Sequence, residues 1–218
     1  MPVKKIFIRF IPLIFLLIFV LLTHTACGGG KDLKITEQTA YEKIQQTLVA
    51  LKSYRCKATV EYKSNKGSNR YETIQHSRIT GEYRVEVTGP EKVAGSVTCS
   101  NGKNIYQYSS RVNGRVSMMV SESGERSEIF LTSFIKNYLK SMEISISVAN
   151  MDAGVCTVLE ASIPGDHPYL ATEKLWINNE TLKPVQLIIY DPNSAERIVV
   201  TYDTFEYNVE LDDSLFTV

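Results

Sequence analysis

The fold is decided by the alternating run Tyr54-Arg55-Cys56-Lys57-Ala58-Thr59-Val60-Glu61-Tyr62-Lys63. Apolar and polar side chains exchange places at every step, which is the period of a β-strand with one buried and one solvated face. Strands of this kind are typical of antiparallel sheets that lie on a core with one face only. The run therefore predicts a sheet that needs a cover on one side.

Similar short runs follow along most of the chain and are separated by turn residues. The signals Asn101-Gly102 and Asn113-Gly114 favour tight hairpins, and Pro164–Pro168 is expected to be a loop. We expect about eleven strands, of which those up to residue 120 form an antiparallel meander. The expected strand segments after the first are 70–78, 82–88, 93–99, 104–109, 117–120, 144–148, 155–163, 173–177, 184–191, 197–202 and 207–211.

Two segments change to the helical period. The first, 37–52, follows Thr36 as an expected N-cap, and the second, 128–140, follows Ser127 in the same role. Both carry an apolar stripe at helical spacing. In the second helix the stripe consists of Phe130, Phe134, Ile135, Tyr138, Leu139 and Met142. A sheet of this many strands must curl, and its inner face must be covered by apolar side chains. The sequence thus predicts an α+β fold in which two helices cover the concave face of a strongly curved sheet, a half-open barrel.

The N-terminus has the pattern of an export signal. Three basic residues precede a 13-residue apolar run, Phe10–Leu22, and this run is too short to span a bilayer. The run ends in Thr25-Ala26-Cys27-Gly28-Gly29-Gly30, which resembles a bacterial lipobox. We expect residues 1–26 to be a lipoprotein signal peptide and 27–35 to be a lipidated Cys27 with a flexible tether. Residues 36–218 are expected to form a single domain.

One residue departs from the lipobox pattern. His24 stands where these motifs usually carry leucine. Ordinary secretion with cleavage near Ala26 and an uncleaved anchor therefore remain as alternatives. With lipidation, the protein would be held on the outer face of a membrane.

Charge excludes one class of partner. The chain has 24 basic and 24 acidic residues, and residues 1–26 hold three of the basic ones, which leaves 21 against 24. A mature domain with a net charge of about −3 has no basic excess for nucleic acid.

The three remaining cysteines, Cys56, Cys99 and Cys156, are odd in number and match no zinc spacing. Buried free thiols are expected, and a single disulfide is the alternative.

Reactive side chains are sparse. His76 and His167 have no second ligand at metal spacing, and no nucleophile motif accompanies Asp166 and His167. We expect no catalytic residues, no metal and no cofactor, with an enzyme that uses Asp166 and His167 as the third-ranked hypothesis. The consecutive Met118 and Met119 are either an ordinary strand pair or an adaptable contact patch for a partner protein.

Three aromatic residues complete the candidate contacts with a partner or a cavity. Phe130 and Phe134 belong to the stripe of the second helix, and Trp176 is the one tryptophan of the chain. Each of them is also a typical core residue.

A family resemblance rests on the last third of the chain. The segment Leu175-Trp176-Ile177, the strand start Pro184-Val185 and the strand end Tyr190-Asp191 resemble the closing hairpin of the bacterial lipoprotein carrier (LolA-like) superfamily. Within that superfamily, the chain is most similar to the GerS-type germination lipoproteins of anaerobic spore formers. The features that carry this similarity are the lipobox, the leading helix, Tyr54–Ala58, the Asn101-Gly102 hairpin and the ending Asn208–Leu211 with Phe216.

The resemblance implies a non-enzymatic partner of a spore-cortex N-acetylmuramoyl-L-alanine amidase. Such a partner supports formation of the muramic-δ-lactam that marks cortex for degradation at germination, and it would lie between the two forespore membranes. The alternative is a lipid or lipoprotein carrier, or an envelope sensor, that uses a concave apolar cavity. A homodimer, including a domain-swapped one, stays open because unclosed sheets have free edges.

Overall fold

The computed structural model describes residues 35–119 and 128–217. The predicted signal peptide, Cys27 with most of its tether, and the Ser127 cap lie outside the described residues. Residues from Ile35 onward form one compact unit.

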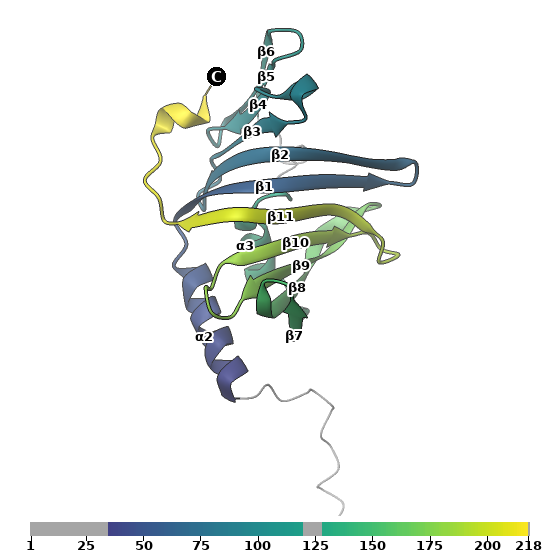
Figure 1. The fold of residues 1–218 in the computed structure, drawn as a ribbon. Helices are drawn as coiled ribbons and strands as arrows, with labels where there is room; N and C mark the ends of the chain where they lie inside the picture. The colour runs from purple at the N-terminus through teal and green to yellow at the C-terminus, as the bar shows by residue number, and fades with distance from the viewer. Residues whose placement is uncertain (1–34, 120–127, 218) are drawn as a thin grey trace, which may run out of the picture. The chain divides into compact units, whose positions relative to one another are not determined.

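The described strands form a single eleven-stranded sheet in which every neighbouring pair is antiparallel, in the order β6-β5-β4-β3-β2-β1-β11-β10-β9-β8-β7 (Figure 1). The strands are β1 (Ser53–Ser64), β2 (Gly67–Arg78), β3 (Tyr83–Gly89), β4 (Val97–Ser100), β5 (Asn104–Ser109), β6 (Gly114–Met119), β7 (Ile144–Met151), β8 (Gly154–His167), β9 (Leu170–Asn178), β10 (Pro184–Tyr190) and β11 (Glu196–Tyr207). The first and last strands pair in the middle of the sheet, so that β6 and β7 are its two edges. The predicted meander is confirmed for β1–β6, and a second meander, β7–β11, joins it through the pairing of β1 with β11.

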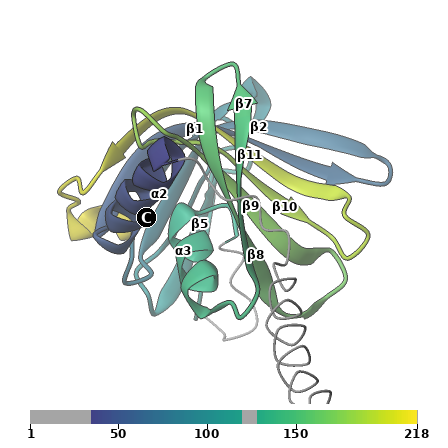
Figure 2. The same cartoon turned by 90° about the horizontal axis from the view of Figure 1, so that it is seen from below.

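Two helices lie on the concave side of the curved sheet, as predicted (Figure 2). Helix α2 spans Ile35–Val49 and α3 spans Leu131–Lys140. The predicted caps and bounds are wrong in detail. Thr36 lies inside α2, and α3 begins three residues later than expected, because Phe130 in extended conformation precedes its first turn.

Three strand predictions are also wrong. The segment 93–99 forms only the short β4, because a 3-10 turn at Glu91–Val93 and a left-handed Gly95 reverse the chain first. The expected loop at 164–168 instead continues β8 as far as His167, past a register shift that leaves Pro164 outside the ladder. The expected strand 197–202 continues as β11 to Tyr207, whereas the expected strand 207–211 does not form, because Asn208 adopts a left-handed conformation with a φ of 53° where β11 ends.

The core fills the concavity. Along the central pair, Cys56 faces Phe205 and Val60 faces Val200, and all four side chains are buried. The Tyr54 and Phe205 rings stack with centroids 4.9 Å apart. Buried residues of α2 and α3 join the same cluster, which also contains inward residues of β8, β9 and β10. Helices and sheet therefore share one core.

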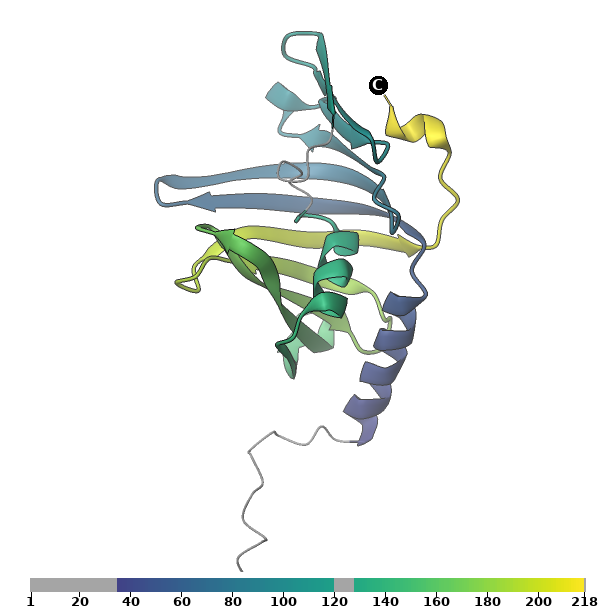
Figure 3. The same ribbon diagram turned by 180° about the vertical axis from the view of Figure 1, so that it is seen from behind.

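The C-terminal segment covers part of the convex face of the sheet, on the side away from the two α-helices. The 3-10 helix η3 (Asp213–Phe216) packs on β3 and β4 and buries Phe216. Arg78 stacks over the Phe216 ring at 4.7 Å and pairs with Asp213 at 2.7 Å. Arg84 donates to the Leu215 carbonyl at 3.3 Å. Figure 3 shows this segment crossing to the β3–β4 end of the sheet.

Replacement of Phe134 by alanine should lower the free energy of unfolding by about 3–5 kcal/mol, because the side chain is fully buried and alanine leaves a cavity. Leu139 on the same helix is 62% exposed, so Leu139→Ala is a matched control that should cost less than about 1 kcal/mol. Urea unfolding of the two variants tests this. Equal losses would contradict the assignment of the buried helix face.

Candidate functional site

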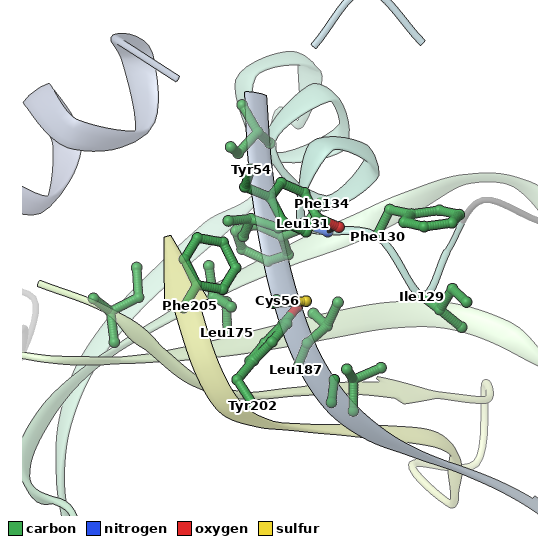
Figure 4. Close-up of a cluster of buried hydrophobic side chains, with 14 of the residues drawn as sticks. Tyr54, Cys56, Ile129, Phe130, Leu131, Phe134, Leu175, Leu187, Tyr202 and Phe205 are labelled. Carbon is green, nitrogen blue, oxygen red and sulfur yellow. Dashed lines mark hydrogen bonds between the residues drawn. The ribbon is translucent and has the colours of Figure 1, made fainter. Parts of the chain in front are cut away.

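Helix α3 is the element that occupies the concavity. Leu131, Phe134 and Ile135 are at most 2% exposed and belong to the same core cluster as inward side chains of the sheet. Figure 4 shows Leu131 and Phe134 in this cluster. The Leu131 N–H donates to the Tyr54 hydroxyl at 3.2 Å, which ties the first turn of the helix to β1. Because side chains of α3 fill this space, the inner face of the sheet is a packed core at this point.

A pocket of about 340 Å³ remains beside α3. More than half of its lining residues are polar: Ser77, Glu128, Thr132, Ser133, Lys136 and Asn137. Ser77 and Thr132 join through their hydroxyls at 2.9 Å across the boundary between β2 and α3. A lining this polar is a poor match for acyl chains, which need apolar walls.

A buried carboxyl lies under α3. Glu173 of β9 is 0% exposed, and Asn137 Nδ2 donates to its Oε1 at 2.8 Å. Its Oε2 has no hydrogen-bond partner among the described residues. Burial raises the pKa of Glu173 to about 7, the nearby Glu128 adds to the rise, and the Asn137 hydrogen bond opposes it. The protonated and ionised forms therefore exchange near neutral pH.

The predicted contact residues fall in different places. Phe130 and Phe134 are buried, and the Phe130 ring packs against Tyr83 with centroids 4.6 Å apart. Met119 is 83% exposed on the edge strand β6, and the side chain of Met118 lies outside the described set. Trp176 is half-buried on the outer face of β9. The five residues do not form one site.

Sequence reasoning missed Glu173. The alternation pattern could have revealed it, since Glu173 lies two and four residues before the buried Leu175 and Ile177 and therefore on the same face of β9. A carboxyl on the inward side of an alternating strand needs a polar partner, and Asn137 supplies one.

The remaining candidates show little reactivity. Cys56, Cys99 and Cys156 are buried free thiols, as predicted, and burial raises the pKa of each. Burial and the neighbouring Arg55 and Arg84 lower the pKa of His76.

His167 accepts a hydrogen bond at Nδ1 from the Tyr169 N–H at 3.2 Å. Within the described ranges, no group of three histidine, cysteine or acidic residues is placed to hold a metal ion. In the same ranges, no helix combines the length and hydrophobicity needed to cross a bilayer.

An open, curved antiparallel sheet with helices in its concavity defines the class of the protein, an α+β half-barrel. The sequence profile of the YdcC-like sporulation proteins matches residues 4–216. The chain belongs to this family. Among curated protein sequences, none matches.

Solved structures give further similarities. An uncharacterised conserved protein from Thermus thermophilus is 12% identical, with a TM-score of 0.51, over 82% of this chain and 91% of the other. A chain in the structure of the Clostridioides difficile amidase CwlD in complex with the GerS lipoprotein is 28% identical, with a TM-score of 0.47, over 82% of this chain and 100% of the other. The LolA superfamily protein NE2245 from Nitrosomonas europaea is 16% identical, with a TM-score of 0.44, over 85% and 99%.

The buried Glu173 predicts a pH dependence of stability. Its folded-state pKa of about 7 exceeds the ordinary value of 4.5, so the native state binds more protons between these values, and Glu173 destabilises the fold progressively as the pH rises through this window. Glu173→Gln removes the charge and should stabilise the protein above pH 7 by up to about 3 kcal/mol.

The measurement is denaturant unfolding of both proteins from pH 4 to pH 8. The gain should vanish below about pH 4.5, where the carboxyl is protonated in both the folded and the unfolded state. A gain that is independent of pH would show that the carboxyl is not the cause.

Proposed function

We propose that this protein is a non-enzymatic lipoprotein, anchored through Cys27, that binds and activates a spore-cortex N-acetylmuramoyl-L-alanine amidase. In this role it supports muramic-δ-lactam formation and cortex degradation at germination. Membership of a sporulation family over nearly the whole chain is the observation that carries the proposal.

The amidase is proposed as partner from the sequence resemblance to GerS-type germination lipoproteins. The GerS protein of Clostridioides difficile was itself solved with the amidase CwlD. In the described part of this chain, no group of three or more histidine, cysteine or acidic residues is placed to hold a metal ion, and the three cysteine thiols are buried. A binding role therefore uses what the domain offers, namely a rigid sheet with two edges and a solvated outer face.

Location follows from the same proposal. An export signal followed by a lipidated cysteine would hold the domain on the outer face of a membrane. For a sporulation protein of this type, that place is the space between the two forespore membranes. A homodimer, domain-swapped or paired through the edge strands β6 or β7, is compatible with this arrangement.

The carrier alternative is less well supported. A carrier needs a concave apolar cavity, whereas α3 fills this concavity and the adjoining pocket is lined mainly by polar residues. Native mass spectrometry of the purified protein that revealed bound acyl chains would restore the carrier hypothesis.

The amidase proposal is tested by mixing the purified mature lipoprotein with the spore-cortex amidase of the same organism. We expect a stable complex on size-exclusion chromatography and a rise in amidase activity on peptidoglycan. A Cys27→Ala chain is the matched control, because binding should persist without the lipid. Absence of both a complex and a change in activity would refute the role.

Anchoring is tested separately. Cys27→Ala should move the protein from the membrane fraction of sporulating cells to the soluble or secreted fraction, because the residue that carries the acyl chains is gone. Intact mass spectrometry of the parent chain should show a diacylglycerol adduct on an N-terminal Cys27. An unmodified thiol at this position would exclude the lipid anchor.

A further inference from the structure

Exposed apolar side chains gather where α3 ends. Leu139 is 62% exposed, Met142 is fully exposed and Ile144 is 49% exposed. Leu139 lies in the last turn of α3, Met142 follows the end of this helix at Lys140, and Ile144 begins β7, so the three exposed side chains lie within six residues of the chain. We call Leu139, Met142 and Ile144 the α3 end patch.

Two exposed lysines of α3 precede this patch in the chain, Lys140 at the end of the helix and Lys136 one turn earlier, where it also lines the pocket beside α3. Lys136 and Lys140 are one helical turn apart, and Leu139 lies between them in the sequence. Glu143 is the acidic residue of the same stretch, so that segment 136–144 carries a net positive charge. Apolar side chains framed by lysines are the chemistry that binds an anionic lipid surface, because the apolar groups enter the interface and the ammonium groups stay at the headgroups.

The patch also lies close to the point where the chain leaves the domain. Gln45 Nε2 donates to the Tyr138 hydroxyl at 2.9 Å, so the last turn of α3 lies against the C-terminal half of α2. Ile35 is ten residues before Gln45 in this helix, a rise of about 15 Å. The start of α2 and the end of α3 point toward the same end of the molecule, the lower end in Figures 1 and 3.

Covalent reach sets the distance to the membrane. Eight residue steps separate Cys27 from Ile35, and they span at most about 28 Å when fully extended. The anchor of the proposed lipoprotein is therefore within reach of the bilayer only when this end of the domain is near the lipid. A tether this short favours contact of the α3 end patch with the headgroups.

We infer that the α3 end patch, with Lys136 and Lys140, rests on the anionic lipid surface to which Cys27 is anchored. This inference rests on the lipid anchor of the proposed function. The contact fixes which end of the domain faces the bilayer, and it leaves the β6 edge, at the other end of the sheet, directed away from the lipid for a protein partner.

Spin labels can test the orientation in the complete mature lipoprotein. Met142→Cys introduces a reactive thiol on the patch, while Cys56, Cys99 and Cys156 are at most 1% exposed and should not label in the folded state. Met119→Cys is the matched control, since Met119 is a similarly exposed methionine at the far edge of the sheet. Both chains are reconstituted in vesicles of phosphatidylethanolamine and phosphatidylglycerol.

We expect the label at position 142 to show a several-fold lower collision rate with a water-soluble nickel chelate in these vesicles than in phosphatidylcholine vesicles. The label at 119 should be unchanged. Replacement of both lysines by glutamate, K136E with K140E, should abolish the shift at 142.

A label at 142 that is as accessible as the one at 119 would overturn the inference. Shielding of 142 that appears only when the amidase is added would also overturn it and would assign the patch to the protein partner. Flotation with the vesicles reports the anchor separately. A chain that fails to float contradicts the anchor and this inference together, whereas a floating chain with an accessible label contradicts the inference alone.

Discussion

The pairing of β1 with β11 is the constraint on which the rest of the structure depends. These strands come from opposite ends of the domain and pair over Tyr54–Tyr62 and Ile198–Tyr207, in the middle of the sheet. All other strands extend outward from this pair by short connections to their sequence neighbours. Closing a loop of about 150 residues is entropically costly, and the buried side chains of this pair, with the Tyr54–Phe205 stack, offset that cost.

The central pair also positions α3. The Tyr54 hydroxyl accepts a hydrogen bond from the N–H of Leu131, the first residue of the helix. This N–H has no partner within the helix and would otherwise be unpaired inside the core. From there, α3 crosses the concavity and reaches Glu173 through Asn137. A curved sheet alone would leave an apolar trough open to solvent, and the helix closes it with its own side chains. The side chains of α3 therefore fill the concavity at this point and leave no open apolar trough there.

Much of this architecture was predictable from periodicity. The alternation in 54–63 and the two helical stripes established the sheet, its buried face and the helices that cover it. The errors came where a tertiary contact overrides local signals. Pro164 and Gly165 indicated a loop, yet the chain there stays extended because a register shift accommodates them beside β9. Ser127 indicated a helix start, whereas burial of Phe130 against Tyr83 precedes the first turn.

The candidate contacts were less predictable, because a sequence does not say which face of an element meets solvent. Phe134 and Leu139 belong to the same predicted stripe, but one is fully buried and the other is mostly exposed. The stripe is wider than the space that the sheet offers, so part of it must remain outside. Glu173 was missed for the opposite reason, since a charged residue in an alternating strand is ordinarily assigned to the wet face.

The three buried cysteines have a consequence for biogenesis. If the chain is exported before it folds, as the proposed lipoprotein would be, Cys56, Cys99 and Cys156 would meet an oxidising environment before the sheet forms. Once folded, the thiols are inaccessible, and their raised pKa values suppress the thiolate needed for exchange. For such a chain, folding would have to bury the three thiols before any two of them are oxidised to a disulfide.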